Sequence, residues 1–190
     1  MDGRSASADR HAPVEVDLKN HRLAAVWAWL WPGAGHLYQG RHGKGWLFMV
    51  CILGTYFFGL SLGGGHVVYA SFRKPDIRYY YIWQLGVGLP ALPALVQSYR
   101  VMRGKPPLLG LDIMAPPSQP VRELERDGLA LWHEKYHGYF ELGTLYTMVA
   151  GLLNLLAIYD AYAGPVFPEP DERQGRARRG KADRAEPSAD

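Results

Sequence analysis

Apolar residues in this chain are gathered into long runs separated by charged stretches. Three of these runs are close to the roughly 20 residues that a helix needs to cross a hydrocarbon core of about 30 Å. They are Trp46 to Gly65, Tyr79 to Tyr99 and Leu142 to Ala163. The first two contain no charged residue, and the third contains only Asp160. The pattern therefore predicts three membrane-spanning helices.

A fourth apolar run, Leu23 to Tyr38, is shorter and contains Pro32, Gly33 and Gly35. Because proline removes a helical donor and glycine loosens the backbone, this run either crosses with a bend or dips into the membrane and returns. We expect it to cross. The predicted fold class is therefore an all-α membrane protein with four spans, at about residues 22–38, 45–65, 79–100 and 141–163.

The polar stretches outside these runs define the domain organisation. Residues 1–19 and 165–190 mix charged and small residues without period, which is typical of disordered tails, and they leave 20–164 as one membrane domain. In the connection before the last run, residues of about 120–139 show a helical period. The apolar residues on one face of this helix are Leu124, Leu131, Trp132 and Tyr139. We expect an amphipathic interfacial helix that continues into the last span.

The formal net charge of +3 does not indicate nucleic-acid binding, because the basic residues sit at helix ends and in the tail rather than along one stripe. Contact with lipid headgroups explains them, which makes the lipid bilayer the first expected partner. With four spans, both tails share a side with the loop 66–78, and the basic residues there favour a cytoplasmic location. We expect a multi-pass protein of the bacterial inner (cell) membrane. A re-entrant first segment would instead place the termini on opposite sides.

One motif matches a catalytic pattern letter for letter. His133, Glu134 and His137 spell H-E-x-x-H, in which two histidines one helical turn apart bind zinc and the glutamate acts as base. The alternative function is therefore a zinc-dependent intramembrane metalloprotease. Such a site needs a third ligand, and Glu141 lies about 6 Å beyond His137 along the same helix, against zinc bonds of about 2 Å. We therefore expect no cofactor here and a solvated interfacial helix.

The stretch WPGAGHLYQGRHGKG (31–45) has the composition of a structured turn between the first two runs. Pro32 stops a helix, and Gly33 and Gly35 allow tight backbone geometry. The other turn residues that we single out are His36, Tyr38 and Gly40. The stretch is not a nucleotide-binding fingerprint, because its glycines follow an apolar helix rather than a strand.

The pattern P-G-x-G-H-x-Y-x-G-x-x-x-K-G in this turn resembles the two-transmembrane-helix domain family. The last run, LYTMVAGLLNLLAIYDAY, resembles the second helix of such domains, which ends in an aspartate. A closer similarity is to an uncharacterised bacterial inner-membrane family that shares both pieces, separated by extra spans, over roughly residues 23–164. Members of the two-helix family carry His-Arg-Phe-Tyr at the turn, where this chain has His36-Leu37-Tyr38. The resemblance implies a membrane architecture and no particular activity.

The last run also carries a face of small and polar residues. Gly143, Thr147 and Gly151 recur every four residues, and Asn154 continues this face together with Ala157 and Ala161. Such a face lets another helix approach closely, from this chain, from a second copy or from another membrane protein. We expect Asn154 to hydrogen-bond across helices.

Asp160 is costly inside a bilayer, so it is expected at the interface or beside a partner. The turn offers three candidates: His36, Tyr38 and Arg41.

The third run contains Gly86, Gly88, Pro90 and Pro93, which predict a kink. A kink suits either a bent helix or the broken helix of a small transporter, or of a transporter subunit. The leading function from sequence is nevertheless non-enzymatic: a structural or protein-interaction role through helix packing. The zinc protease and the transporter are its alternatives.

Overall fold

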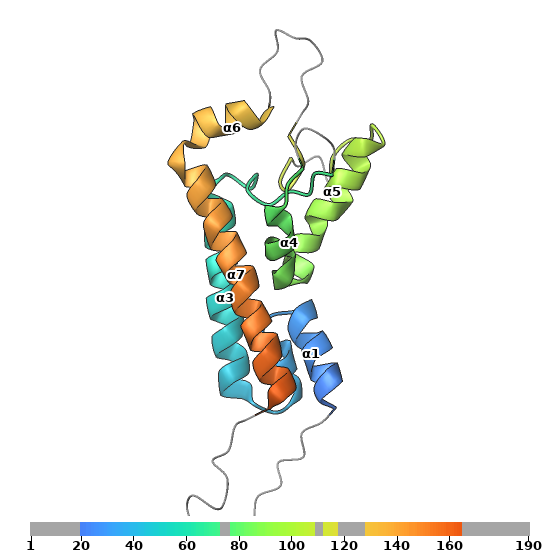
Figure 1. Cartoon of the computed structure of the whole chain (residues 1–190), viewed down its shortest axis with the longest axis vertical. Coiled ribbons are helices and arrows are strands. Elements are labelled where there is room, and N and C mark those ends of the chain that lie inside the picture. The colour runs from blue at the N-terminus through green and yellow to red at the C-terminus, as the bar shows by residue number, and fades with distance from the viewer. Residues whose placement is uncertain (1–19, 73–76, 109–111, 118–127, 165–190) are drawn as a thin grey trace, which may run out of the picture.

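The computed structural model describes residues 20–72, 77–108, 112–117 and 128–164, and these residues form helices and loops without a strand. Two long helices make up the centre, α3 (His42–Leu62) and α7 (Gly138–Ala163). They run antiparallel and form the largest helix–helix contact (Figure 1). Their backbones meet at Gly59 and Gly143, where a Cβ on Gly59 would lie 2.9 Å from the Gly143 carbonyl oxygen. The small residues of the predicted face therefore bring α7 close to α3.

The first apolar run forms a hairpin instead of a crossing helix. The helix α1 (His21–Leu30) rises from the lower end of the molecule in Figure 1, and α2 (Ala34–Tyr38) descends again beside it. Gly33 makes the reversal with a φ of 83°, a conformation that glycine adopts without a Cβ penalty. The expected crossing at residues 22–38 is thus not formed, because Pro32 and Gly33 end α1 after 10 residues. We call residues 21–38 the lower hairpin.

The third apolar run is also a hairpin, and it enters from the opposite end. It consists of α4 (Tyr80–Gln84), the short 3₁₀ turns η1 (Leu85–Val87) and η2 (Leu89–Ala91), and α5 (Leu92–Met102). Gly88 has a φ of 86°, and Pro90 removes an amide donor directly after it. The kink expected in residues 79–100 is a full reversal, and α5 returns to the upper end (Figure 1). We call residues 80–102 the upper hairpin.

The tips of the two hairpins meet near the middle of the molecule. A Cβ on Gly88 would overlap the carbonyl oxygen of Trp29, so the upper tip rests directly on the end of α1. Along the chain, each hairpin is followed by a long helix, and the two hairpin–helix units run in opposite directions (Figure 1). The arrangement is not symmetric in its contacts, because α1, α4 and η1 all pack on α7.

The predicted interfacial helix does not continue into α7. The helix α6 (Gly128–Tyr136) ends before His137, which has a φ of 47° and starts a new helix direction. Residues 120–127 of the prediction lie outside the described residues, as do the tails 1–19 and 165–190. The break places α6 across the upper end of the molecule, at an angle to α7 (Figure 1).

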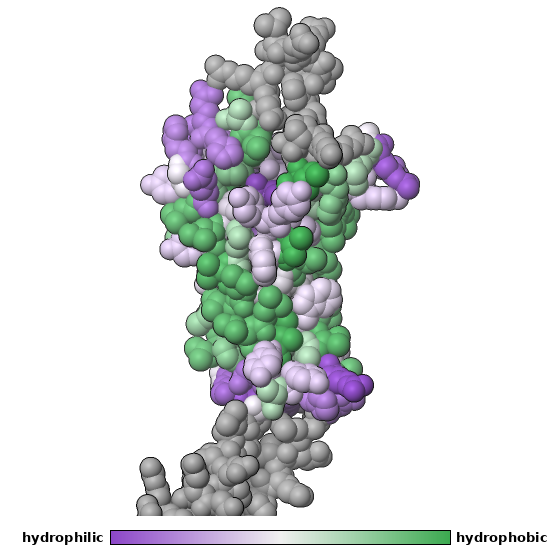
Figure 2. All heavy atoms as spheres, viewed as in Figure 1, coloured by the Kyte–Doolittle hydropathy of each residue, from purple (hydrophilic) through white to green (hydrophobic). Residues whose placement is uncertain are grey.

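On the face shown in Figure 2, apolar side chains form a band over the middle of the molecule, and hydrophilic side chains gather at both ends. In the described part of the chain, α3 and α7 are the two helices that are long and apolar enough to cross a membrane. Many large apolar side chains on them face outward, for example Leu47 at 60%, Val50 at 65% and Leu156 at 66% exposure.

Both described chain ends lie at the lower end, whereas the loop after α3 lies at the upper end (Figure 1). Four spans would have put that loop on the side of the tails. In the structure, two runs form hairpins, and the loop that ends at Arg78 lies at the end opposite the described chain ends.

Candidate functional site

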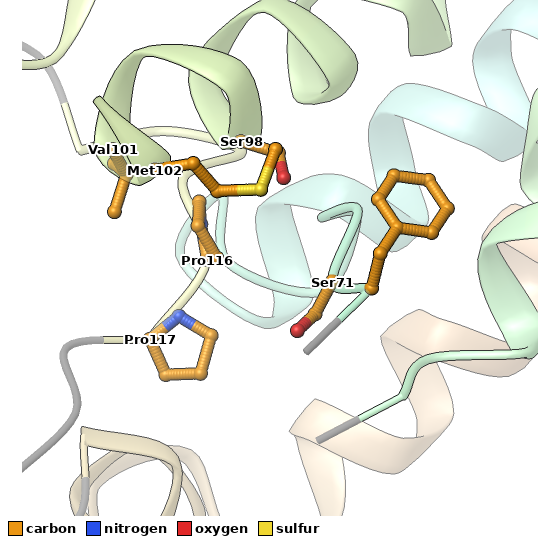
Figure 3. A pocket seen from close by; sticks show the side chains of 7 residues that line it. Ser71, Ser98, Val101, Met102, Pro116 and Pro117 are labelled. Atoms are coloured by element: carbon orange, nitrogen blue, oxygen red, sulfur yellow. The ribbon is translucent and has the colours of Figure 1, made fainter. Parts of the chain in front are cut away.

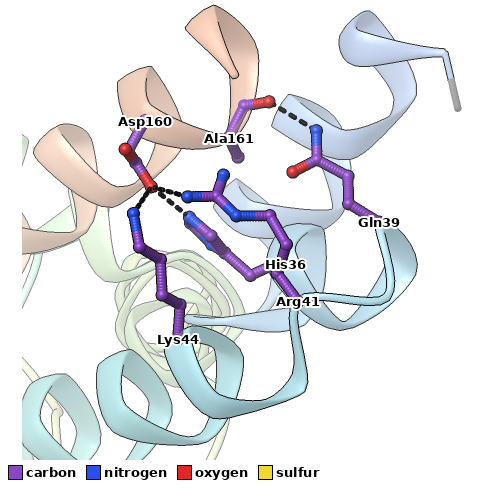
Figure 4. A network of polar contacts seen from close by, with 6 residues as sticks. All are labelled: His36, Gln39, Arg41, Lys44, Asp160 and Ala161. Atoms are coloured by element: carbon purple, nitrogen blue, oxygen red, sulfur yellow. Dashed lines mark hydrogen bonds and ion pairs between the residues drawn. The ribbon is translucent and has the colours of Figure 1, made fainter. Parts of the chain in front are cut away.

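An ion cluster at the lower end joins the turn to the end of α7 (Figure 4). Oδ2 of Asp160 accepts a hydrogen bond from Nε2 of His36 at 2.8 Å. The same oxygen lies 3.1 Å from Nη2 of Arg41 and 3.5 Å from Nζ of Lys44. Two of the three partners expected from sequence, His36 and Arg41, therefore contact Asp160, and Lys44 was not expected. We call these four residues the lower ion cluster.

The turn sequence explains how these side chains converge. Gly33 turns the chain so that α2 carries His36 into the interior. There His36 is fully buried, and the centre of its ring lies 4.9 Å from the centre of the Phe48 ring. Tyr38 is the last residue of α2, and Gly40 follows with a φ of 78°. Beside the cluster, the Gln39 amide donates to the carbonyl of Ala161 at 2.7 Å. Since the last carbonyls of a helix lack intrahelical donors, this bond caps α7.

The charges in the lower ion cluster do not cancel. One carboxylate faces two permanent cations, Arg41 and Lys44, which leaves an excess of one positive charge when His36 is neutral. His36 satisfies the carboxylate as a neutral ring with hydrogen on Nε2, and its Nδ1 is buried without a hydrogen-bond partner. A carboxylate held by three donors ties α2, α3 and α7 together.

A second polar centre lies where the two hairpin tips meet. The amide nitrogen of Asn154 donates to the carbonyl of Ala28 at 3.2 Å and to that of Gly86 at 2.9 Å. Ala28 lies in the last turn of α1, and Pro32, four residues later, has no amide hydrogen to donate to its carbonyl. Gly86 lies in the 3₁₀ turn η1, which ends at Gly88, so its carbonyl stands at the end of a turn, where intrahelical donors are missing. One side chain of α7 thus supplies a donor to both hairpins.

Further polar groups follow the same face of α7 upward. Thr147 is buried and accepts a hydrogen bond from the Gln84 amide at 2.9 Å, and the same amide donates to the Val67 carbonyl at 3.1 Å. Arg78 donates to Val67, to Thr144 at 3.1 Å and to the Tyr69 hydroxyl at 3.0 Å. Burial lowers the pKa of the Arg78 guanidinium from its ordinary value. The polar interior therefore serves mainly to hold backbone groups of the hairpin and loop.

The predicted face of small and polar residues on α7 packs against other parts of the same chain. Its members are all buried: Gly143, Thr147, Gly151, Asn154, Ala157 and Ala161. Gly151 lies against the backbone of Trp83 and Gly86 in the upper hairpin. The close approach expected from sequence is made to α3 and to both hairpins.

The H-E-x-x-H residues do not share one helix. His133 lies on α6 and its Nδ1 is 2.9 Å from the Leu129 carbonyl, while His137 follows the end of α6 with a left-handed φ. Glu134 is exposed on α6. In the described ranges no three His, Cys, Asp or Glu side chains come together as a metal site. The premise of two histidines on one uninterrupted helix is therefore wrong.

Two surface hollows are large enough for an organic group. One, of about 440 Å³, lies between α3 and α7 and ends at Asp160. The other, of about 560 Å³, lies between α4, α6 and α7 and has Arg78, His133 and Glu141 in its wall. A third cleft, beside Ser71, Ser98 and Met102, holds only about 50 Å³ (Figure 3). Because a water molecule takes up about 30 Å³ of liquid, the third cleft has room for solvent only.

Comparison with protein families shows which family the chain belongs to. A model described as "Family of unknown function (DUF6677)" matches residues 23–174. The chain belongs to DUF6677. No curated protein matches it, and no solved structure does. The DUF6677 match covers the lower hairpin, both long helices and the upper hairpin, and it agrees with the predicted similarity to an uncharacterised family. The similarity to the two-transmembrane-helix domain family remains a sequence-based prediction.

Sequence reasoning missed three residues that matter in this DUF6677 chain: Lys44, Arg78 and Gln84. Gln84 had a readable signal, since it is a polar residue inside the apolar run 79–99. The hydrogen bond from Asn154 to Ala28 had a weaker signal. Pro32 marks a carbonyl four residues earlier in a helix that needs a donor from elsewhere.

Proposed function

We propose that this chain is a multi-pass integral protein of the bacterial inner (cell) membrane with a structural or protein-interaction role. In this proposal α3 and α7 cross the bilayer, and the two hairpins enter it from opposite sides and meet at mid-depth. The band of exposed apolar side chains carries the proposal (Figure 2). A water-soluble monomer rarely exposes a continuous apolar patch of this kind.

The hairpins satisfy the rule that backbone groups at membrane depth need internal partners. Two carbonyls at turn ends, of Ala28 and Gly86, receive their hydrogen bonds from Asn154. This use of a polar side chain to hold main-chain carbonyls supports a structural role. The outward faces of α3 and α7 are then left to lipids, to a second copy or to other membrane proteins.

Transport is the second candidate, and the two opposed hairpins favour it. Broken helices that meet at mid-depth are typical of transporters. It ranks below the structural role because the meeting point is filled by Gly88 against Trp29. Flux measurements on proteoliposomes across a panel of ions and small solutes test it.

Carbonate extraction of isolated membranes tests the membrane assignment. An integral protein stays in the pellet, and release of the chain into the supernatant would overturn the proposal.

Cysteine labelling separates the two topologies. In a Cys51→Ser background, single cysteines replace Ser71 or Gly104, and intact cells are treated with a membrane-impermeant maleimide. We expect both cysteines to label from the same side, because the hairpin returns to its starting face. Labelling from opposite sides would restore the four-span arrangement.

The placement of both tails in the cytoplasm rests on the basic residues of 165–190 together with Arg22, Arg41 and Lys44. Reporter domains fused to residue 190 test this placement, since an enzyme active only in the periplasm stays silent on a cytoplasmic tail.

A further inference from the structure

The upper pocket, of about 560 Å³, combines a charged rim with an apolar wall. Arg78, His133 and Glu141 supply its polar side chains, and Phe140, Leu145 and Met148 supply apolar surface. Glu141, Leu145 and Met148 follow one face of α7 at spacings of four and three residues, which places them one above another. Leu145 lies seven residues into α7, about 10 Å from its start. The rim thus sits at the headgroup level and the apolar wall deeper.

Arg78 brings a positive charge to this pocket. Among the described residues, the ion pairs within 4.0 Å all belong to Asp160 at the other end of the molecule. The described contacts of Arg78 are uncharged: it donates to the Tyr69 hydroxyl, the Val67 carbonyl and Thr144, and its guanidinium carbon lies 4.1 Å from the centre of the Tyr69 ring. Its buried Nε has no hydrogen-bond partner within the described part of the chain. A partly buried guanidinium in this state attracts an anionic group, and phosphate matches its geometry.

Glu141 brings the opposite charge to the same rim. It stands one helical turn before Thr144, the residue that Arg78 contacts, and it is exposed. His133 adds a further acceptor, because its Nδ1 is engaged with the Leu129 carbonyl and a neutral ring then has a lone pair on Nε2. The rim therefore offers separate positions for a negative and a positive group.

We propose that the upper pocket binds an ethanolamine phospholipid, with its phosphate at Arg78, its ammonium at Glu141 and an acyl chain along Leu145 and Met148. The inference rests on the proposed membrane location. A phosphatidylglycerol headgroup is a poorer fit, because it has no cation to pair with Glu141. A choline headgroup has a cation that cannot donate a hydrogen bond to the carboxylate.

Native mass spectrometry of the full chain, purified in mild detergent and delipidated, tests the inference. The protein is titrated with phosphatidylethanolamine, phosphatidylglycerol and phosphatidylcholine that carry identical acyl chains. We expect the ethanolamine lipid to bind about tenfold more tightly than the choline lipid, as one charge-assisted hydrogen bond predicts. Equal binding of all three lipids, or a preference for the glycerol lipid, would overturn it.

Glu141→Gln is the central variant, because this side chain is exposed and we expect the fold to tolerate its replacement. We expect it to remove the preference for ethanolamine over choline and to leave the glycerol lipid bound as before or more tightly. Glu134→Gln on α6 is the charge-matched control and should keep the preference. An unchanged preference in Glu141→Gln would contradict the placement of the ammonium.

Two further measurements test whether Arg78 binds the phosphate and whether that phosphate belongs to a lipid. Arg78→Lys keeps the charge but loses the planar fork, so all three lipids should bind more weakly, while thermal unfolding checks that it is folded. Glycerophosphoethanolamine without acyl chains should bind at least tenfold more weakly than the lipid, and equal binding would mean a soluble phosphoester ligand and refute the lipid. If carbonate extraction shows an integral protein and the lipid preference is absent, only this inference fails.

Discussion

The carbonyl oxygen of Gly86 accepts a hydrogen bond from the amide of Asn154 at 2.9 Å. Gly86 lies at the tip of the upper hairpin, and the same amide also reaches Ala28 in the lower hairpin. A single side chain on α7 thus joins two segments that enter from opposite ends. Both carbonyls lie at the end of a helical turn, where intrahelical donors are missing, so the bonds replace missing main-chain contacts.

Replacing Asn154 by Leu should lower the free energy of unfolding by about 1 to 3 kcal/mol, since it leaves two buried acceptors unpaired. Unfolding in mixed detergent micelles measures the change. Leu155→Ala is the control, because Leu155 is the next residue and its side chain is exposed. It should lower the free energy of unfolding by less than Asn154→Leu does. Equal losses in both variants would mean that the bridge contributes nothing beyond packing.

Gly88→Ala should be among the most destabilising single changes in the chain. It combines a left-handed φ of 86° with overlap between the new Cβ and the Trp29 carbonyl oxygen. Backbone strain and overpacking together predict a loss of about 2 to 5 kcal/mol. Gly104→Ala also places a side chain at a positive φ, of 64°, but there is open space around its Cβ. The control should lose only the strain, about 1 to 2 kcal/mol. Similar melting temperatures for the two variants would refute the contact between the tips.

Asp160→Asn should destabilise the lower end, because Arg41 and Lys44 would then face each other without a carboxylate. We expect a loss of about 1 to 3 kcal/mol. Lys44→Met should cost about 0 to 1 kcal/mol, because Lys44 is half-exposed and the most distant partner at 3.5 Å. Thermal unfolding at low and high salt measures both. A larger loss in Lys44→Met than in Asp160→Asn would contradict the geometry of the lower ion cluster.

His66 should make the upper end sensitive to acid. Its ring stacks on Trp132 at 4.6 Å, and burial lowers its pKa, with Lys135 acting in the same direction and Asp112 opposing it. Because the folded pKa lies below the unfolded value of about 6.5, the unfolded chain binds more protons as the pH falls. Stability is therefore complete above pH 6.5 and declines below it. Melting temperatures between pH 7.5 and 5.5 measure this decline. It should be smaller in His66→Phe, which keeps the stacking, and unchanged in His133→Gln.

The sequence predicts α3 and α7 well, because each is a continuous apolar run without a proline. It also predicts the contact between Asp160 and the turn, since a lone carboxylate in such a run needs a nearby cation. The upper hairpin is harder to predict from the sequence, because Gly88, Pro90 and Pro93 are equally compatible with a kinked helix and with a reversal of the chain. Which of the two forms depends on a contact with Trp29, which lies about 60 residues away in the sequence and packs against the tip of the upper hairpin. The H-E-x-x-H pattern failed because periodicity does not register the single left-handed residue His137.

Asn154 follows both hairpins along the chain, and this order has a consequence for biogenesis. A ribosome completes both hairpins before it adds the residue that supplies their donors. In the proposed membrane arrangement, the carbonyls of Ala28 and Gly86 have no partner at membrane depth until α7 inserts. Chains truncated before residue 154 should therefore be degraded by membrane quality control, whereas chains that lack only the residues after 164 should accumulate.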